Sequence, residues 1–213
     1  MYKVLHIILI QFFSLTVLSC STSDDSKTTT STTTTSSTTS SPSHVVVGSE
    51  GTILTSSDNG TSWDNVTSGT TERLSGVGFG NNTFVVVGDN YNDSATILTS
   101  SDNGTTWTSS TYSEDISFSG VTYGNGNFIA VGPMNFYPIF SDSPGIIIRS
   151  TDNGTTWDNV TSPTSNDLVG VTFGNNTFVA VGDSGNFVRS TDNGSSFNDV
   201  TSPTTQILWG VAF

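Results

Sequence analysis

The sequence has few basic residues, one cysteine and two histidines. Five Lys and Arg stand against 18 Asp and Glu, which gives a formal net charge of −13. A surface this acidic repels phosphate backbones and argues against a nucleic-acid partner. His6 lies in an N-terminal apolar stretch and His44 stands alone, so no histidine cluster exists for a metal or for a Ser-His pair. We therefore expect no metal site and no cofactor.

The single cysteine excludes an internal disulfide framework. It follows Lys3 and an apolar run from Val4 to Leu18, which is typical of a signal peptide and too short for a membrane-spanning helix. Residues 17–20, Val-Leu-Ser-Cys, resemble a bacterial lipobox, although Leu18 is larger than the usual residue there. The resemblance implies a signal peptide over residues 1–19, lipidation of Cys20, and an outer-membrane or cell-surface lipoprotein of a Gram-negative bacterium. The alternative is a cleaved secretion signal with an incidental cysteine.

Residues 20–43 consist almost entirely of Ser and Thr. Such a segment buries too little apolar surface to offset the entropy lost on ordering, so we expect a disordered tether. The folded domain is expected over residues 44–213.

No helical periodicity appears after residue 43, and one short pattern occurs four times. Each copy has the form Ser-x-Asp-Asn-Gly-x-x-Trp or Phe, an Asn-Gly turn between β-prone runs. Its Ser, Asp, Gly and aromatic positions are Ser56, Asp58, Gly60 and Trp63; Ser100, Asp102, Gly104 and Trp107; Ser150, Asp152, Gly154 and Trp157; and Ser190, Asp192, Gly194 and Phe197.

This pattern resembles the Asp-box of sialidase-like (BNR-repeat) β-propellers. The wider repeat, as in residues 174–183, is similar to bacterial propellers related to the photosystem II assembly factor. The resemblance covers residues 44–213 and implies that the Asp-boxes are structural turns without a catalytic role.

Four short strands per repeat predict an all-β propeller of four-stranded antiparallel blades. In the last complete repeat we expect strands over residues 168–173, 178–182, 187–190 and 197–200. By comparison with the repeat, the segment that begins at His44 corresponds to the second strand of a blade. Residues 208–213 correspond to the first strand of a blade. Two interpretations remain open: four blades closed by the C-terminal strand, or a fragment of a larger propeller.

Strand parity places the Asp-boxes at one end of the blades and the longer connections at the other end. Variable loops on a uniform scaffold are typical of a recognition surface. Acidic and aromatic residues gather in these loops and suit sugar rings, which stack on aromatic side chains. They could equally be solvated carboxylates and rings that plug the centre of the propeller. The candidate binding residues are Asp89, Tyr91, Tyr112, Glu114, Asp115, Phe136, Tyr137, Asp142 and Asp183.

Two functional hypotheses follow. The first is a non-catalytic, surface-tethered monomer that presents its loops to a glycan or to another surface protein. The second is a secreted glycoside hydrolase-like enzyme that uses carboxylates of the loops. Sialidase chemistry is disfavoured, because Arg149 and Arg189 precede Asp-boxes and cannot converge with Arg73.

Overall fold

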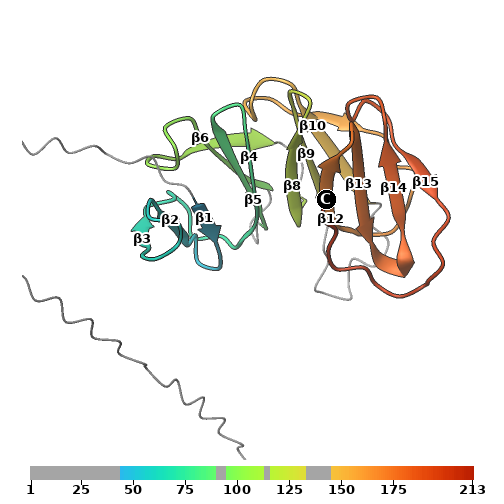
Figure 1. Ribbon diagram of the computed structural model, residues 1–213, viewed down its shortest axis with the longest axis horizontal. Helices are drawn as coiled ribbons and strands as arrows, with labels where there is room; N and C mark the ends of the chain where they lie inside the picture. The colour runs from blue at the N-terminus through green and yellow to red at the C-terminus, as the bar shows by residue number, and fades with distance from the viewer. Residues whose placement is uncertain (1–43, 90–94, 113–115, 133–144) are drawn as a thin grey trace, which may run out of the picture. The chain divides into compact units, whose positions relative to one another are not determined.

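The computed structural model describes residues 44–89, 95–112, 116–132 and 145–213, all within one compact unit, residues 39–213 (Figure 1). The described residues form antiparallel sheets and one short 3-10 helix, η2 (Asp183–Gly185). The predicted all-β propeller with four blades is confirmed.

Each blade is one sheet whose strands follow the order of the chain. Blade 1 contains β1 (His44–Val47), β2 (Ile53–Ser56) and β3 (Asp64–Val66). Blade 2 contains β4 (Leu74–Gly80), β5 (Thr83–Gly88), β6 (Ala95–Ser100) and β7 (Thr108–Tyr112). Blade 3 contains β8 (Gly120–Gly124), β9 (Asn127–Gly132), β10 (Ile146–Ser150) and β11 (Asp158–Val160). Blade 4 contains β12 (Leu168–Gly174), β13 (Thr177–Gly182), β14 (Phe187–Ser190) and β15 (Asn198–Val200).

The second strands of blades 2 and 3 are buried along their whole length. Every residue of β5 and of β9 is buried, and both strands are nearly continuous apolar runs. A strand covered on both faces loses the alternation of a half-buried strand. Three apolar cores follow the chain, the first around Ile53 and Val86, the second around Val85 and Phe128, and the third around Ile129 and Phe178.

Glycines let the first strands of successive blades approach closely. A Cβ at Gly124 would lie 2.1 Å from the Cγ atom of Phe173, and one at Gly80 would lie 2.0 Å from Tyr123. β4 contacts β8, and β8 contacts β12. An aromatic ring of one blade therefore occupies the space that a glycine leaves in the blade before it.

The C-terminal residues 208–213 continue this series against β12. The Leu208 N–H donates to the Gly182 carbonyl at 3.0 Å, as the Leu74 N–H donates to the Gly48 carbonyl at 2.9 Å. Phe213 lies against Gly174. The predicted pairing of this segment with blade 1 is not found among the described residues, where β1 is the edge of a three-stranded sheet. The hydrogen bond of Leu208 and the contact of Phe213 are both with blade 4, and strand phase alone does not reveal them.

The glycine contacts can be tested by Gly124→Ala. The added methyl group overlaps the Phe173 ring, so we expect a loss of about 1–3 kcal/mol of unfolding free energy. Chemical denaturation measures this loss. Gly210→Ala is the control, because no atom lies within 4 Å of the Cβ position there. Equal stability of the two variants would contradict the packing described for the first strands.

Candidate functional site

The four Asp-boxes are closed by hydrogen bonds within each turn. In blade 3, Ser150 Oγ donates to Asp152 Oδ1 at 2.8 Å and accepts from the Gly154 N–H at 2.8 Å. The Asp152 carboxylate accepts from the Thr156 N–H at 2.9 Å and from the Thr156 hydroxyl at 2.6 Å. Trp157 Nε1 donates to the Gly154 carbonyl at 3.1 Å. The serine and aspartate bonds recur in the other three copies.

These bonds keep the Asp-box carboxylates ionised. The hydroxyl of Ser62 lowers the pKa of Asp58 to about 2, and the hydroxyl of Thr106 does the same for Asp102. The hydroxyl of Ser196 likewise lowers the pKa of Asp192 to about 2. A carboxylate with its oxygens engaged in its own turn stabilises the turn and is poorly suited to act as a general acid or base.

Contacts between blades show that the Asp-boxes share one end of the sheets. Asn81, in the β4–β5 turn, donates to the side chain of Asn153 in the next blade's Asp-box at 2.9 Å. Asn125, in the β8–β9 turn, donates to Asn193 in the same way at 3.0 Å. We call this the Asp-box end, and the opposite end the loop end.

At the loop end, Asp89 pairs with an arginine in the connection that precedes β4. Its carboxylate forms an ion pair with Arg73 at 3.2 Å, and its side chain is only 14% exposed. Burial raises the pKa of Asp89 above its ordinary value, and the Arg73 guanidinium only partly offsets this effect. Asp89 is therefore a partly buried, paired group and a poor candidate for the first contact with a ligand.

Tyr112 does not form the exposed aromatic platform that the sequence suggested. It is 8% exposed, its ring packs on Phe118 with centroids 5.8 Å apart, and its hydroxyl bonds Asn159 Oδ1 in blade 3. Tyr112 ends β7 opposite Ala95, and there its ring enters the core between blades 2 and 3. That contact depends on the packing of two blades, which residue type does not indicate.

Asp183 is the only other predicted binding residue within the described part of the chain. It begins η2 and is partly buried, and its carbonyl accepts from the backbone N–H of Asn186. The remaining predicted binding residues lie outside the described residues: Tyr91, Glu114, Asp115, Phe136, Tyr137 and Asp142.

Among the described residues, the segments that follow β3, β11 and β15 are more uniform than the sequence suggested. Ser68 Oγ donates to the Thr70 carbonyl at 3.1 Å, and the Thr70 hydroxyl accepts from the Glu72 N–H at 3.1 Å. Ser-x-Thr turns of the same kind recur at residues 162–164 and 202–204. The repeated Ser-x-Thr spacing was a signal in the sequence for this rigid element. The copy in blade 1 has Gly69 where the others have proline.

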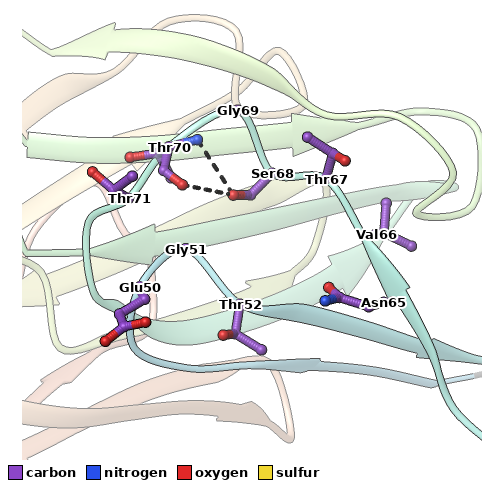
Figure 2. A pocket seen from close by; sticks show the side chains of 10 residues that line it. All are labelled: Glu50, Gly51, Thr52, Asn65, Val66, Thr67, Ser68, Gly69, Thr70 and Thr71. Carbon is purple, nitrogen blue, oxygen red and sulfur yellow. Dashed lines mark hydrogen bonds between the residues drawn. The ribbon is translucent and has the colours of Figure 1, made fainter.

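Beside this turn lies a pocket of about 730 Å³ (Figure 2). Its walls are the β1–β2 connection, the end of β3 and the Ser68–Thr70 turn. Glu50 is its single charged side chain, and Asn65 faces it from β3. The rest of the lining consists of glycines, hydroxyl side chains and Val66, so the pocket offers polar contacts and one negative charge.

Glu50 occupies a backbone position that suits it poorly. Its φ angle is 55°, and 9 of the 11 described non-glycine residues with positive φ are asparagines. The equivalent turn in blade 4 has Ser184, with φ 54°, at this position. A glutamate in the left-handed region is sterically unfavourable. The turn places its carboxylate at the rim of the pocket.

Two features are absent from the described residues. No group of three or more His, Cys, Asp or Glu side chains is arranged to hold a metal ion. None of the described segments is a helix of the length and apolar character that crossing a membrane requires.

The sequence matches the family described as Photosynthesis system II assembly factor YCF48 over residues 26–206. The chain belongs to the YCF48 family. None of the curated proteins matches this chain.

Solved propellers share the fold. A structure of YCF48 bound to D1 peptide has 18% identity and a TM-score of 0.58, with 79% of this chain and 53% of that chain covered. YCF48 from Cyanidioschyzon merolae has 19% identity and a TM-score of 0.58 over 79% and 55% of the two chains. An ancestral GH74 enzyme has 23% identity and a TM-score of 0.60 over 77% and 23%. The chain thus spans about half the length of the YCF48 structures, and these similarities show the fold alone.

The Asp-box hydrogen bonds predict acid sensitivity. Because the folded pKa of Asp58, Asp102 and Asp192 is about 2, below the ordinary aspartate value of 3.8, the unfolded chain takes up protons first as pH falls. Stability from these groups is present above about pH 4 and is lost as pH falls toward 2. Urea midpoints measured from pH 5 to pH 2 check this. Asp102→Asn should have a shallower pH dependence than the control Asp64→Asn, and equal slopes would contradict it.

Proposed function

We propose that this chain is a non-catalytic binding protein that holds a polypeptide partner in the pocket beside Glu50. Membership of an assembly-factor family supports a binding role. A YCF48 structure with a bound peptide supports a peptide ligand in particular, since the two chains share a fold.

The observation that carries this proposal is the make-up of the pocket. Its wall is a turn whose own hydrogen bonds fix it before any ligand arrives, so binding need not order that segment. Asn65 and the exposed Thr67 and Thr71 provide donors and acceptors suited to a peptide backbone. Glu50 adds an acceptor for a basic side chain. A volume of about 730 Å³ accommodates several residues of an extended peptide or a comparable ligand.

Filling the pocket tests the proposal. Peptides selected from a phage-displayed random library on the full chain are titrated against Asn65→Trp, whose indole would occupy the pocket beside β3. We expect affinity to fall at least about tenfold, because the ring excludes the ligand. Asp199→Trp is the matched control, since Asp199 is the equivalent exposed residue of β15 in blade 4.

Glu50→Ser refines this test without loss of the turn, because it reproduces the serine found at this position in blade 4. It should weaken only those peptides that carry Lys or Arg. Equal affinity of wild type and Asn65→Trp for every selected peptide would contradict the site. Binding of glycans in place of peptides, or hydrolysis of a glycan, would favour the glycan-binding or glycoside hydrolase alternative.

We further propose that the propeller is tethered to a membrane by lipidated Cys20 and the Ser/Thr-rich segment after it. The lipobox-like residues 17–20 support this proposal. Cys20→Ser should move the protein from the detergent phase to the aqueous phase in Triton X-114 partitioning. Retention of the variant in the detergent phase would contradict lipidation, and Ser19→Ala serves as the matched control.

A further inference from the structure

A second cavity lies at the Asp-box end, between blades 2 and 3. It has a volume of about 280 Å³ and is lined by six hydroxyl side chains together with Asp152 and Asn153. Thr83, Thr99, Thr106 and Thr108 contribute from blade 2. Since no apolar side chain lines it, the cavity suits a small polar or charged group.

The equivalent groove between blades 3 and 4 contains an arginine of the chain itself. Two contacts establish the equivalence of the grooves. A Cβ on Gly154 would lie 3.0 Å from Thr99, and a Cβ on Gly194 would lie 3.7 Å from Arg149 Cδ. Thr99 and Arg149 therefore occupy the same position relative to the next blade's Asp-box.

In this groove the Arg149 guanidinium has one amide oxygen as its acceptor, and its buried Nε has no hydrogen-bond partner among the described residues. Arg149 donates to Asn127 Oδ1 at 3.4 Å, and Asn127 Nδ2 donates to the Asn193 carbonyl at 3.2 Å. In the groove between blades 2 and 3, Thr83 replaces Asn127 and Thr99 replaces Arg149. The Thr83 hydroxyl points to the Asn81 carbonyl at 3.4 Å, so it does not bridge to the next blade as Asn127 does. The shorter side chains leave the cavity open.

Charge favours a cation in the open groove. Partial burial alone would raise the pKa of Asp152, but hydrogen bonds from Thr156 and Ser150 hold it below its ordinary value. Asp152 is therefore negative at neutral pH. The threonine hydroxyls add oxygen acceptors, which match the planar fork of N–H donors on a guanidinium.

We infer that the cavity between blades 2 and 3 is a binding site for a guanidinium group, such as the arginine side chain of a polypeptide. The site lies at the opposite end of the sheets from the Glu50 pocket, and the inference does not depend on the function proposed for that pocket.

Titration of the full chain in detergent with acetyl-Gly-Arg-Gly-amide tests the site, with calorimetry and threonine-methyl NMR as readouts. We expect saturable binding that shifts the methyl signals of Thr83, Thr99 and Thr108. The peptide with citrulline in place of arginine should bind at least about tenfold more weakly, because it has the same shape without the charge. Guanidinium chloride is titrated in parallel. If the ion binds and the peptide does not, the ligand is a small free guanidino compound. This outcome supports a guanidinium-binding site but excludes the arginine of a polypeptide as its ligand.

Thr99→Arg closes the cavity from within, as Arg149 does in the next groove. It should lose at least about tenfold in affinity, whereas Thr205→Arg, which adds the same charge at an exposed residue outside the cavity, should bind like the wild type. Arg149→Thr should open a second cavity and raise the stoichiometry to two.

If Thr99→Arg does not fold, Thr99→Val provides a variant that removes one hydroxyl without filling the cavity, and it should weaken binding. The site would be overturned by the absence of saturable binding, by citrulline binding as tightly as arginine, or by unchanged affinity in a folded Thr99→Arg variant.

Discussion

The close approach of consecutive blades is the constraint on which the rest of the structure depends. A glycine at the end of β8 receives the ring of Phe173 from β12, and the distance of 2.1 Å leaves no room for a Cβ atom. Blades 2 and 3 each have a neighbouring blade on both sides, and their second strands, β5 and β9, are buried along their whole length. At the two ends of the sheets, the turns satisfy the polar groups of the backbone and of their own side chains.

The turns at the two ends of the sheets satisfy their polar groups with different hydrogen bonds. At the Asp-box end, a serine and an aspartate satisfy the turn and hold an asparagine at positive φ. At the loop end, the side-chain bonds that close the Ser-x-Thr turns come from hydroxyl groups alone. A scaffold that repeats this closely makes single-residue differences informative, since Glu50 can be compared with Ser184 and Thr99 with Arg149 at equivalent positions.

How far the sequence predicted the structure depended on the range of the interactions involved. Asn-Gly turns and the Asp-box are set by neighbouring residues, so the blades and the shared end of the Asp-boxes could be predicted. Tyr112 could not be placed, because its partners are Phe118, in the connection after β7, and Asn159, in another blade. The position of residues 208–213 likewise depends on Gly182 and Gly174 of the preceding blade.

The pocket beside Glu50 was missed for a different reason. The prediction from the sequence rested on aromatic and acidic residues, which are concentrated in the longer loops. Several of these loops lie outside the described residues. The pocket is lined instead by the Ser68–Thr70 turn, whose middle residue is Gly69 where the later copies carry Pro163 and Pro203. The feature of the sequence that marks this turn is the glycine at position 69, which departs from the proline of the other copies.

The acidity of the chain connects the two proposed sites. A net charge of −13 creates a field that attracts cationic partners over distances of about a Debye length, roughly 8–10 Å at physiological ionic strength. Part of that charge is fixed, because the hydrogen bonds of the Asp-boxes keep Asp58, Asp102 and Asp192 ionised down to about pH 2. Each proposed site then adds one carboxylate, Glu50 or Asp152, among neutral acceptors. The general field favours encounter with basic segments, while the arrangement of neutral oxygens around a single carboxylate selects which basic group is retained.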